Sequence, residues 1–140
     1  MSGFLFDTCA VSELIKPSPN AGAIKWMGRV HSVLTFLSVM TIAEVRRGVE
    51  KRVPDKRRAF LEAWLMSELP QMFAGRILSI DGEVADRYGH VVATAERRGV
   101  SVGIIDALIG ATALHHNLSV VTRNAGHFEA LGVPIVNPWG

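Results

Sequence analysis

The chain has 140 residues, of which 49% are hydrophobic and 20% are charged, and its formal net charge at pH 7 is +2. This length suits one domain with a substantial core, and this hydrophobic content excludes an intrinsically disordered chain. No apolar run is long enough to span a membrane, and the single cysteine, Cys9, excludes an internal disulfide. We therefore expect one domain over residues 1–140, without a signal peptide, in a reducing cytoplasm.

The first predicted strand, Phe4–Phe6, ends directly before a carboxylate, Asp7. Two explanations fit Asp7. It caps the helix that begins near Thr8, or it holds a cation at the carboxyl end of a strand, where open α/β sheets bind their ligands. Which explanation holds depends on whether further acids gather beside it. We expect the neighbouring Cys9 to be a small packed residue of the first helix turn.

Strands and helices alternate along the rest of the chain. The predicted strands cover about residues 4–6, 34–37, 77–80, 119–122 and 134–136, the last of them at a sheet edge. The predicted helices cover about residues 11–16, 21–30, 41–51, 60–74, 82–98 and 104–116, and the apolar stripe of the fourth is expected to be core. This alternation favours a three-layer α/β/α sandwich with a mostly parallel sheet of four to five strands.

Glu44 lies three residues after Thr41, where we expect a helix to begin. The sequence Thr41-Ile42-Ala43-Glu44 matches a capping box, in which the glutamate bonds back to the backbone amide of the threonine. This structural role would account for Glu44 without any chemistry. The local sequence favours neither the capping role nor a role in a functional site.

Asp106 lies in the first turn of a helix of small residues, where the helix dipole favours an anion. Its neighbours on the same helix face are Gly110 and Ala113, so a solvated surface carboxylate does not fit this apolar helix. We expect Asp106 to point at a close neighbour, either a strand end or a metal ion.

The fourth strand ends in a polar turn, Thr122 to His127, at the same sheet edge as Asp7. Thr122 or Asn124 could simply cap a helical turn there. In a parallel sheet, however, Asp7, Asp106 and this turn can meet in one crevice, and carboxylates brought together require a counter-charge. Oxygen ligands suit Mg²⁺ or Mn²⁺, which can activate water and offset negative charge on a phosphodiester. The residues indicate an acidic metal site and leave its substrate open.

Six motifs occur together in one order. They are Phe6-Asp7-Thr8, Ser12-Glu13-Leu14, Thr41-Ile42-Ala43-Glu44 with Gly48, Asp106 in its small-residue helix, Thr122-Arg123-Asn124 and Val136-Asn137-Pro138-Trp139. Over essentially the whole chain they resemble a PIN-domain ribonuclease of the VapC toxin type, in its FitB-like branch.

The resemblance implies a single PIN-like nuclease domain and a Mg²⁺- or Mn²⁺-dependent endoribonuclease, the toxin of a type II toxin–antitoxin pair. Residues matching Asp7, Glu44 and Asp106 bind the metal in that family and activate the attacking water, and the residue matching Thr122 helps to hold water or metal. The implied partners are RNA, a cognate antitoxin that sends a basic side chain into the acidic pocket, and a second copy of the chain. Higher toxin–antitoxin assemblies are implied as well, and a membrane is not.

Two positions depart from the family pattern. Cys9 stands where an asparagine usually follows Asp-Thr, and His127 stands where a fourth acid is usual. One hypothesis is that His127 weakens a second metal position and shifts preference towards Mn²⁺, which tolerates imidazole better than Mg²⁺ does. The other is that His127 makes no metal contact and that Asn124 or water takes the place.

Two other functions remain as alternatives. His127 motivates a PIN-like module that binds nucleic acid or antitoxin and has weakened catalysis. A phosphohydrolase of the haloacid-dehalogenase type fits poorly, because Cys9 stands where that family requires a second aspartate after Asp7.

Several basic residues and one aromatic residue have weaker interpretations. The run that follows Glu44 comprises Arg46, Arg47, Lys51, Arg52, Lys56, Arg57 and Arg58. Such a run is usually a solvated face, although it could also grip RNA phosphates. Arg123 could contact a phosphate or cap a turn, and we expect Trp139 to be a packing residue.

Overall fold

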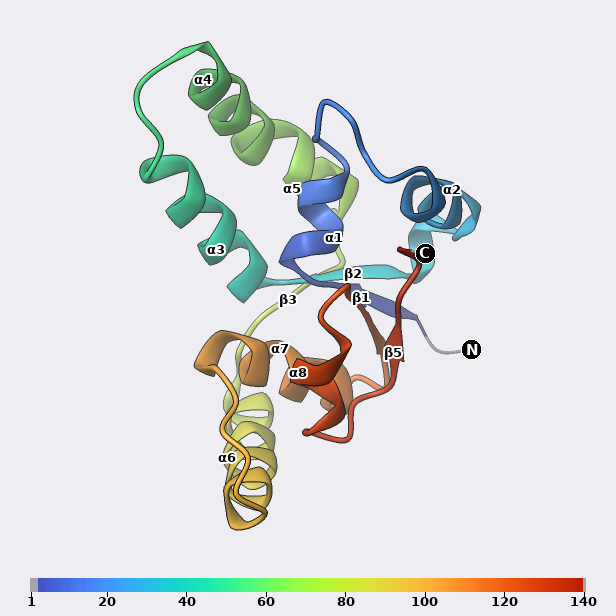
Figure 1. Cartoon of the computed structure of the whole chain (residues 1–140), viewed down its shortest axis with the longest axis vertical. Coiled ribbons are helices and arrows are strands. Elements are labelled where there is room, and N and C mark those ends of the chain that lie inside the picture. The colour runs from blue at the N-terminus through green and yellow to red at the C-terminus, as the bar shows by residue number, and fades with distance from the viewer. Residues whose placement is uncertain (1–2, 140) are drawn as a thin grey trace.

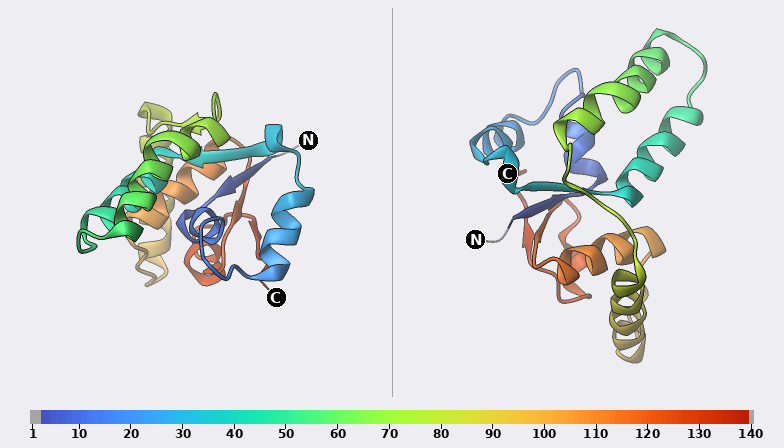
Figure 2. Two further views of the ribbon diagram at one scale, coloured as in Figure 1. Left: turned by 90° about the horizontal axis from the view of Figure 1, so that it is seen from above. Right: turned by 180° about the vertical axis from the view of Figure 1, so that it is seen from behind.

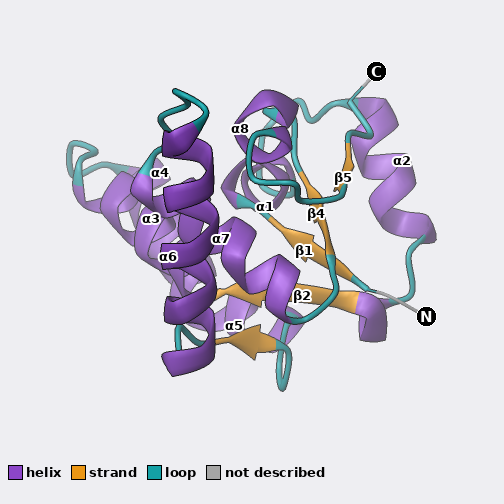
Figure 3. Cartoon of the chain, turned by 90° about the horizontal axis from the view of Figure 1, so that it is seen from below, coloured by secondary structure: helices purple, strands orange, loops and turns teal. Residues whose placement is uncertain are grey.

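A computed structural model describes residues 3–139. Its centre is a five-stranded sheet in which every pair of neighbours is parallel, with strand order β3-β2-β1-β4-β5. The strands are β1 (Phe4–Phe6), β2 (Thr35–Ser38), β3 (Ile77–Leu78), β4 (Ser119–Val121) and β5 (Ile135–Val136). The first strand in the chain is thus the central one, between β2 and β4 (Figure 3).

Helices cover both faces of the sheet. They are α1 (Thr8–Glu13), α2 (Ala21–Arg29), α3 (Val39–Glu50), α4 (Lys56–Ala63), α5 (Leu69–Met72), α6 (Gly82–Arg97), α7 (Ile104–His115) and α8 (Ala125–Glu129). Helices α1 to α5 lie on one side and α6 to α8 on the other (Figures 1 and 2). The three-layer sandwich expected from the sequence is confirmed. In the part of the chain described, no helix is long and apolar enough to cross a membrane.

Side chains of the strands alternate between two cores, as the period of two along a strand requires. Leu5 and Val120 belong to the core beneath α6 to α8, and Phe6 and Val121 belong to the core beneath α1 to α5. All four are less than 5% exposed, and full burial of such a side chain contributes about 1.5 to 3 kcal/mol. Apolar residues on both faces therefore hold β1 rigidly in the middle of the molecule.

Helix α3 begins at Val39 and not at Thr41 as predicted, so the capping box, one of the two roles weighed for Glu44, does not form. Strand β2 extends to Ser38, which pairs with Leu78, and the Oγ of Ser38 caps α3 by accepting a hydrogen bond from the backbone N of Met40 at 3.0 Å. Thr41 lies inside the helix and fully buried, and its hydroxyl has no hydrogen-bond partner among residues 3–139. Glu44 is therefore free of the structural role that competed with a functional one.

The predicted long helix after Asp55 is a continuous helical segment with a π-helical portion, Trp64–Glu68, between α4 and α5. Leu65, Leu69 and Phe73 of its apolar stripe are buried as expected. Phe60 is not, at 49% exposure, because α4 projects with α3 beyond the sheet (Figure 1).

A buried carboxylate, Glu13, joins the first helix to the end of the chain. It is 1% exposed and accepts hydrogen bonds from Nε1 of Trp139 at 2.7 Å and from the backbone N of Asn20 at 2.8 Å. The Nζ of Lys16 lies 3.2 Å from Oε1 of the same carboxylate. The hydrogen bond from Trp139 is the largest of the causes that lower the pKa of Glu13 to about 2.

We expect this arrangement to make stability depend on acid pH. The pKa of Glu13 lies below its ordinary value of 4.5, so the ionised carboxylate stabilises the folded state above about pH 4.5. This contribution, roughly 2 to 3 kcal/mol, should be lost as the pH falls towards 2. Urea unfolding measured across this range should give a smaller pH dependence for Glu13→Gln than for the wild type. Glu96→Gln, on the exposed face of α6, is the matched control, and an unchanged pH dependence in Glu13→Gln would contradict the assignment.

Candidate active site

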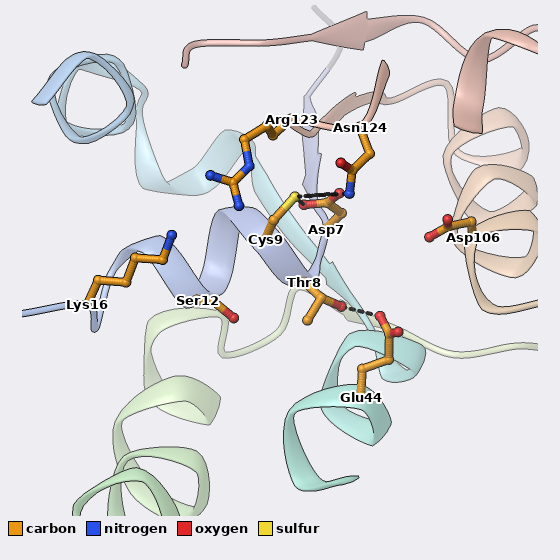
Figure 4. Close-up of a pocket in the computed structure, with 9 residues that line it drawn as sticks. All are labelled: Asp7, Thr8, Cys9, Ser12, Lys16, Glu44, Asp106, Arg123 and Asn124. Carbon is orange, nitrogen blue, oxygen red and sulfur yellow. Dashed lines mark hydrogen bonds between the residues drawn. The ribbon is translucent and has the colours of Figure 1, made fainter. Parts of the chain in front are cut away.

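A cavity of about 410 Å³ opens at the carboxyl ends of β1 and β4 (Figure 4). It is lined by Asp7, Thr8, Cys9, Ser12, Lys16, Glu44, Asp106, Arg123 and Asn124. These residues come from the end of β1, from α1 and the turn after it, from α3, from the start of α7 and from the loop after β4. The crevice expected at this sheet edge is present, and it holds all three acids that the sequence singled out.

Asp7 combines the two roles that the sequence left open. It is 5% exposed, and its Oδ1 caps α1 by accepting a hydrogen bond from the backbone N of Ala10 at 3.0 Å. Burial raises the pKa of Asp7, hydrogen bonds from Thr122, Cys9 and Ala10 oppose the rise, and the charge of Asp106 adds to it. No ion pair formed within residues 3–139 involves Asp7. A capped but uncompensated buried carboxylate is well suited to a bound cation.

The side chain of Glu44 points towards α1 and not towards the backbone amides of its own helix, α3. Its Oε1 accepts a hydrogen bond from the hydroxyl of Thr8, the residue that follows Asp7 (Figure 4). Thr8 thus tethers Glu44, which lies on α3, to the end of β1. This contact brings a second carboxylate to the cavity. It also gives both residues of the Asp7-Thr8 pair a role there, because one is a carboxylate of the cavity and the other holds a second carboxylate.

Asp106 is held by the histidine that departs from the family pattern. The Nδ1 of His127, on α8, lies 2.6 Å from Oδ2 of Asp106. The side chains are 58% exposed for His127 and 30% for Asp106, and Asp106 lines the cavity whereas His127 lines a neighbouring pocket together with Asp106. An imidazole therefore stands directly beside the third carboxylate.

The small residues next to Asp106 have a reason of their own. A Cβ at Gly110 would lie 2.9 Å from Cδ1 of Leu131 and 3.3 Å from Cγ2 of Val133, so α7 packs closely on the segment before β5. Asp106 does have a close neighbour, but that neighbour is His127 of α8 and not the strand end that was one of the two expectations, and Gly110 serves the core and not the cavity.

Thr122 is fully buried, and its hydroxyl accepts a hydrogen bond from the backbone N of Asn124 at 2.9 Å. It therefore stabilises the turn after β4, as the structural interpretation expected, while also donating to Asp7 and lowering the pKa of that carboxyl. Thr122 lies behind the cavity lining, next to Asp7.

Cys9 lies in the first turn of α1 as expected, but it also lines the cavity and contacts Asp7, which the sequence did not predict. Its Sγ donates to both oxygens of Asp7, at 3.0 and 3.2 Å, and lies 3.8 Å from the hydroxyl of Thr122. Burial first, and the charge of Asp7 next, raise the pKa of Cys9 to about 11, so the thiol stays protonated and can donate. Its spacing of two residues from Asp7, in the first helix turn, was the signal that could have revealed this contact.

The three carboxylates share a cavity without closing into a cage. Within residues 3–139, no group of three or more His, Cys, Asp or Glu side chains is arranged to enclose a metal ion. Thr8 holds Glu44 and His127 holds Asp106, whereas Asp7 is held by the backbone N of Ala10 and the thiol of Cys9. The donor set is nevertheless all oxygen and strongly acidic, which is the chemistry that Mg²⁺ and Mn²⁺ require.

The basic run after Glu44 is engaged on the surface. Arg46 lies within 4 Å of Glu50 and Glu62, and Arg58 pairs with Glu50 at 3.0 Å. Arg57 donates to the backbone O of Ile15 at 2.7 Å. These contacts support the interpretation of the run as a solvated face.

Comparison with known proteins places this geometry among relatives. Residues 4–133 match the family model of the PIN domain. Over 135 residues the chain is 36% identical to toxin FitB of Neisseria gonorrhoeae (strain ATCC 700825 / FA 1090), covering 96% of this chain and 97% of that protein. It is 35% identical to VapC ribonuclease Y4jK of Sinorhizobium fredii (strain NBRC 101917 / NGR234), covering 96% of each. The crystal structure of FitAcB from Neisseria gonorrhoeae superposes with a TM-score of 0.92 at 36% identity, covering 97% of this chain and 98% of that chain.

The bond between Thr8 and Glu44 should be measurable as a coupling energy. Thr8→Val removes the hydroxyl but keeps the branched shape, and we expect it to lower the free energy of unfolding by about 1 kcal/mol. In a double-mutant cycle with Glu44→Ala, urea unfolding should give a coupling of about 1 kcal/mol. Thr8→Ser retains the donor and should keep most of that coupling. Strictly additive losses from Thr8→Val and Glu44→Ala would show that the two side chains do not interact.

Proposed function

The chain belongs to the PIN-domain family, and from this we propose that it is a metal-dependent endoribonuclease, the toxin of a type II toxin–antitoxin pair. The observation that carries the proposal is the gathering of Asp7, Glu44 and Asp106, from three separate elements, around one cavity. Relatives named as a toxin and as a VapC ribonuclease support the reaction and the role.

The proposed reaction is hydrolysis of an RNA phosphodiester bond. Asp7, Glu44 and Asp106 would hold a Mg²⁺ or Mn²⁺ ion. When bound, the ion would lower the pKa of a water molecule and offset the negative charge that develops on the phosphodiester.

The protein's own groups prepare the carboxylates for this work. The amide of Ala10 and the thiol of Cys9 fix the carboxylate of Asp7, and the hydroxyl of Thr8 directs Glu44 towards the cavity. Glu44, half-buried, is our candidate to take the proton of the attacking water. Thr122, buried behind the lining, would act indirectly on that water and on the metal by holding the carboxylate of Asp7.

The partners and setting follow the same reasoning. The acidic cavity suits a basic side chain of an antitoxin, which would pair with the carboxylates that the metal uses. The FitAcB structure, which this chain resembles over nearly its whole length, supports such a partner. We propose that residues 1–140 form one nuclease domain that acts as a homodimer in the cytoplasm and assembles further with its antitoxin.

A second function has one observation in its favour. The 2.6 Å contact between His127 and Asp106 occupies one oxygen of a proposed metal ligand. A protein in which this contact impairs metal binding would be a module that binds nucleic acid or antitoxin with little or no catalysis.

Loss of single carboxylates tests the nuclease. Asp7→Asn and Asp106→Asn should each reduce cleavage of labelled single-stranded RNA in Mg²⁺ by roughly 100-fold or more. Each substitution replaces a charged metal ligand by a neutral amide of similar shape. Chelation of divalent ions with EDTA should abolish cleavage by the wild type. Asp86→Asn, on the exposed face of α6, is the control for loss of one negative charge. Undiminished cleavage by both variants, or cleavage that survives EDTA, would refute the mechanism, and RNA binding by an inactive wild type would favour the second function.

The metal preference tests His127. We propose that its imidazole favours Mn²⁺ over Mg²⁺, so His127→Asp should raise the affinity for Mg²⁺ relative to Mn²⁺ by roughly tenfold. Isothermal titration calorimetry with each ion measures this without reference to activity. His116→Asp, at the exposed end of α7, repeats the substitution outside the cavity. An unchanged ratio of affinities in His127→Asp would mean that His127 makes no metal contact.

A further inference from the structure

The cavity has a basic side as well as an acidic one. Lys16, just after α1, and Arg123, just after β4, line it together with the three acids. Figure 4 shows both cationic side chains on one side of Asp7 and Cys9, with Glu44 and Asp106 on the other. The cavity is therefore polarised between a cationic and an anionic end.

Arg123 differs from the arginines of the surface run in its partners. Arg46 and Arg58 are paired with glutamates, whereas no carboxylate within residues 3–139 lies within 4.0 Å of the guanidinium of Arg123. Its Cζ lies instead 5.8 Å from the ring centroid of Trp139. A cation–π contact uses the face of the guanidinium and leaves its N–H donors, which point along the plane, free for a ligand.

Trp139 is itself held by a buried group. Its Nε1 donates to Oε1 of Glu13 at 2.7 Å, and Glu13 is 1% exposed. Lys16 binds the same Oε1 through one of its three ammonium donors, at 3.2 Å. One buried carboxylate thus orients both cations: Lys16 directly, and Arg123 through the indole on which it rests.

We propose that Lys16 and Arg123 bind the RNA backbone phosphate next to the scissile phosphodiester. Trp139 is the positioning residue for Arg123. This inference rests on the proposed function, because it assigns the ligand of the cationic end from the substrate of the acidic end. A phosphate group matches the pair in charge, and its oxygens match the planar donors of Arg123 and the point charge of Lys16. Because such contacts read no base, they supply affinity without sequence preference.

Metal-free RNA binding tests the assignment separately from catalysis. Fluorescence anisotropy of a short labelled single-stranded RNA in EDTA, over a series of salt concentrations, gives Kd and its salt dependence for the full chain. Arg123→Ala and Lys16→Ala should each raise Kd by roughly fivefold to tenfold and reduce the slope of log affinity against log salt by about 0.7. Arg97→Ala, an exposed arginine on α6 outside the cavity, should change neither quantity.

The positioning role of Trp139 requires its own pair of variants. Trp139→Leu removes the ring and should weaken RNA binding as much as Arg123→Ala does. Trp139→Phe keeps a ring for Arg123 but loses the bond to Glu13, and it should fall between the wild type and Trp139→Leu. In the cleavage assay with metal, Arg123→Ala should raise KM with little change in kcat, which general destabilisation would not produce.

The outcomes of these experiments separate the phosphate-site proposal from the nuclease proposal. Wild-type Kd and salt slope in Arg123→Ala and Lys16→Ala, or equal losses in Arg97→Ala, would overturn the phosphate assignment even if the wild type cleaves RNA. Loss of antitoxin binding with unchanged RNA binding would assign the cations to a protein partner and would likewise overturn it. If the wild type binds RNA without cleaving it, and the cavity variants lose that binding, the nuclease proposal fails while the phosphate site stands.

Discussion

The burial of one negative charge at the end of the central strand is the constraint on which the rest of the site depends. Asp7 follows β1, and β1 is locked between β2 and β4 by apolar residues on both of its faces. A carboxylate in that position cannot retreat to solvent, so its environment must supply donors or a counter-ion. The amide of Ala10, the thiol of Cys9 and the hydroxyl of Thr122 are the donors that the fold provides. The two other acids of the cavity make a divalent cation the natural counter-ion.

Much of this architecture could be predicted from the sequence, because it depends on local patterns. Alternating apolar runs and helical stripes are sufficient to indicate the parallel sheet and its two helical layers. Asp7 and Asp106 stood out because each is a charge placed against an apolar element. Helix caps are local in the same way: Asn20 and Asp81, both of residue types that favour the start of a helix, each accept a hydrogen bond from the amide three residues on.

The predictions that were wrong or missing have a common physical cause. In each case several side chains could fill one role, and only contacts made in the folded structure decide which of them does. Ser38 and Thr41 are both able to cap a helix, and the pairing of β2 with β3, which reaches Ser38, decides between them. Cys9 is of a residue type that is usually packed in the core, yet its thiol donates a hydrogen bond to the side chain of Asp7. Trp139 is 126 positions away from Glu13 along the chain, so no local pattern could reveal their bond.

The contact between Glu13 and Trp139 bears on the order in which the two ends of the cavity are made during synthesis. The groups that surround the cavity are made throughout synthesis, from Asp7 near the start to Arg123, and the indole beneath Arg123 comes from the end of the chain. A nascent chain that still lacks its last strand, β5, already carries β1 to β4 and all three acids, but it lacks the indole that supports Arg123. The acidic end of the cavity is therefore encoded before the group that supports its cationic end. The segment that follows β5, far from α1 in the sequence, thus completes the surroundings of a cavity that begins at the end of β1.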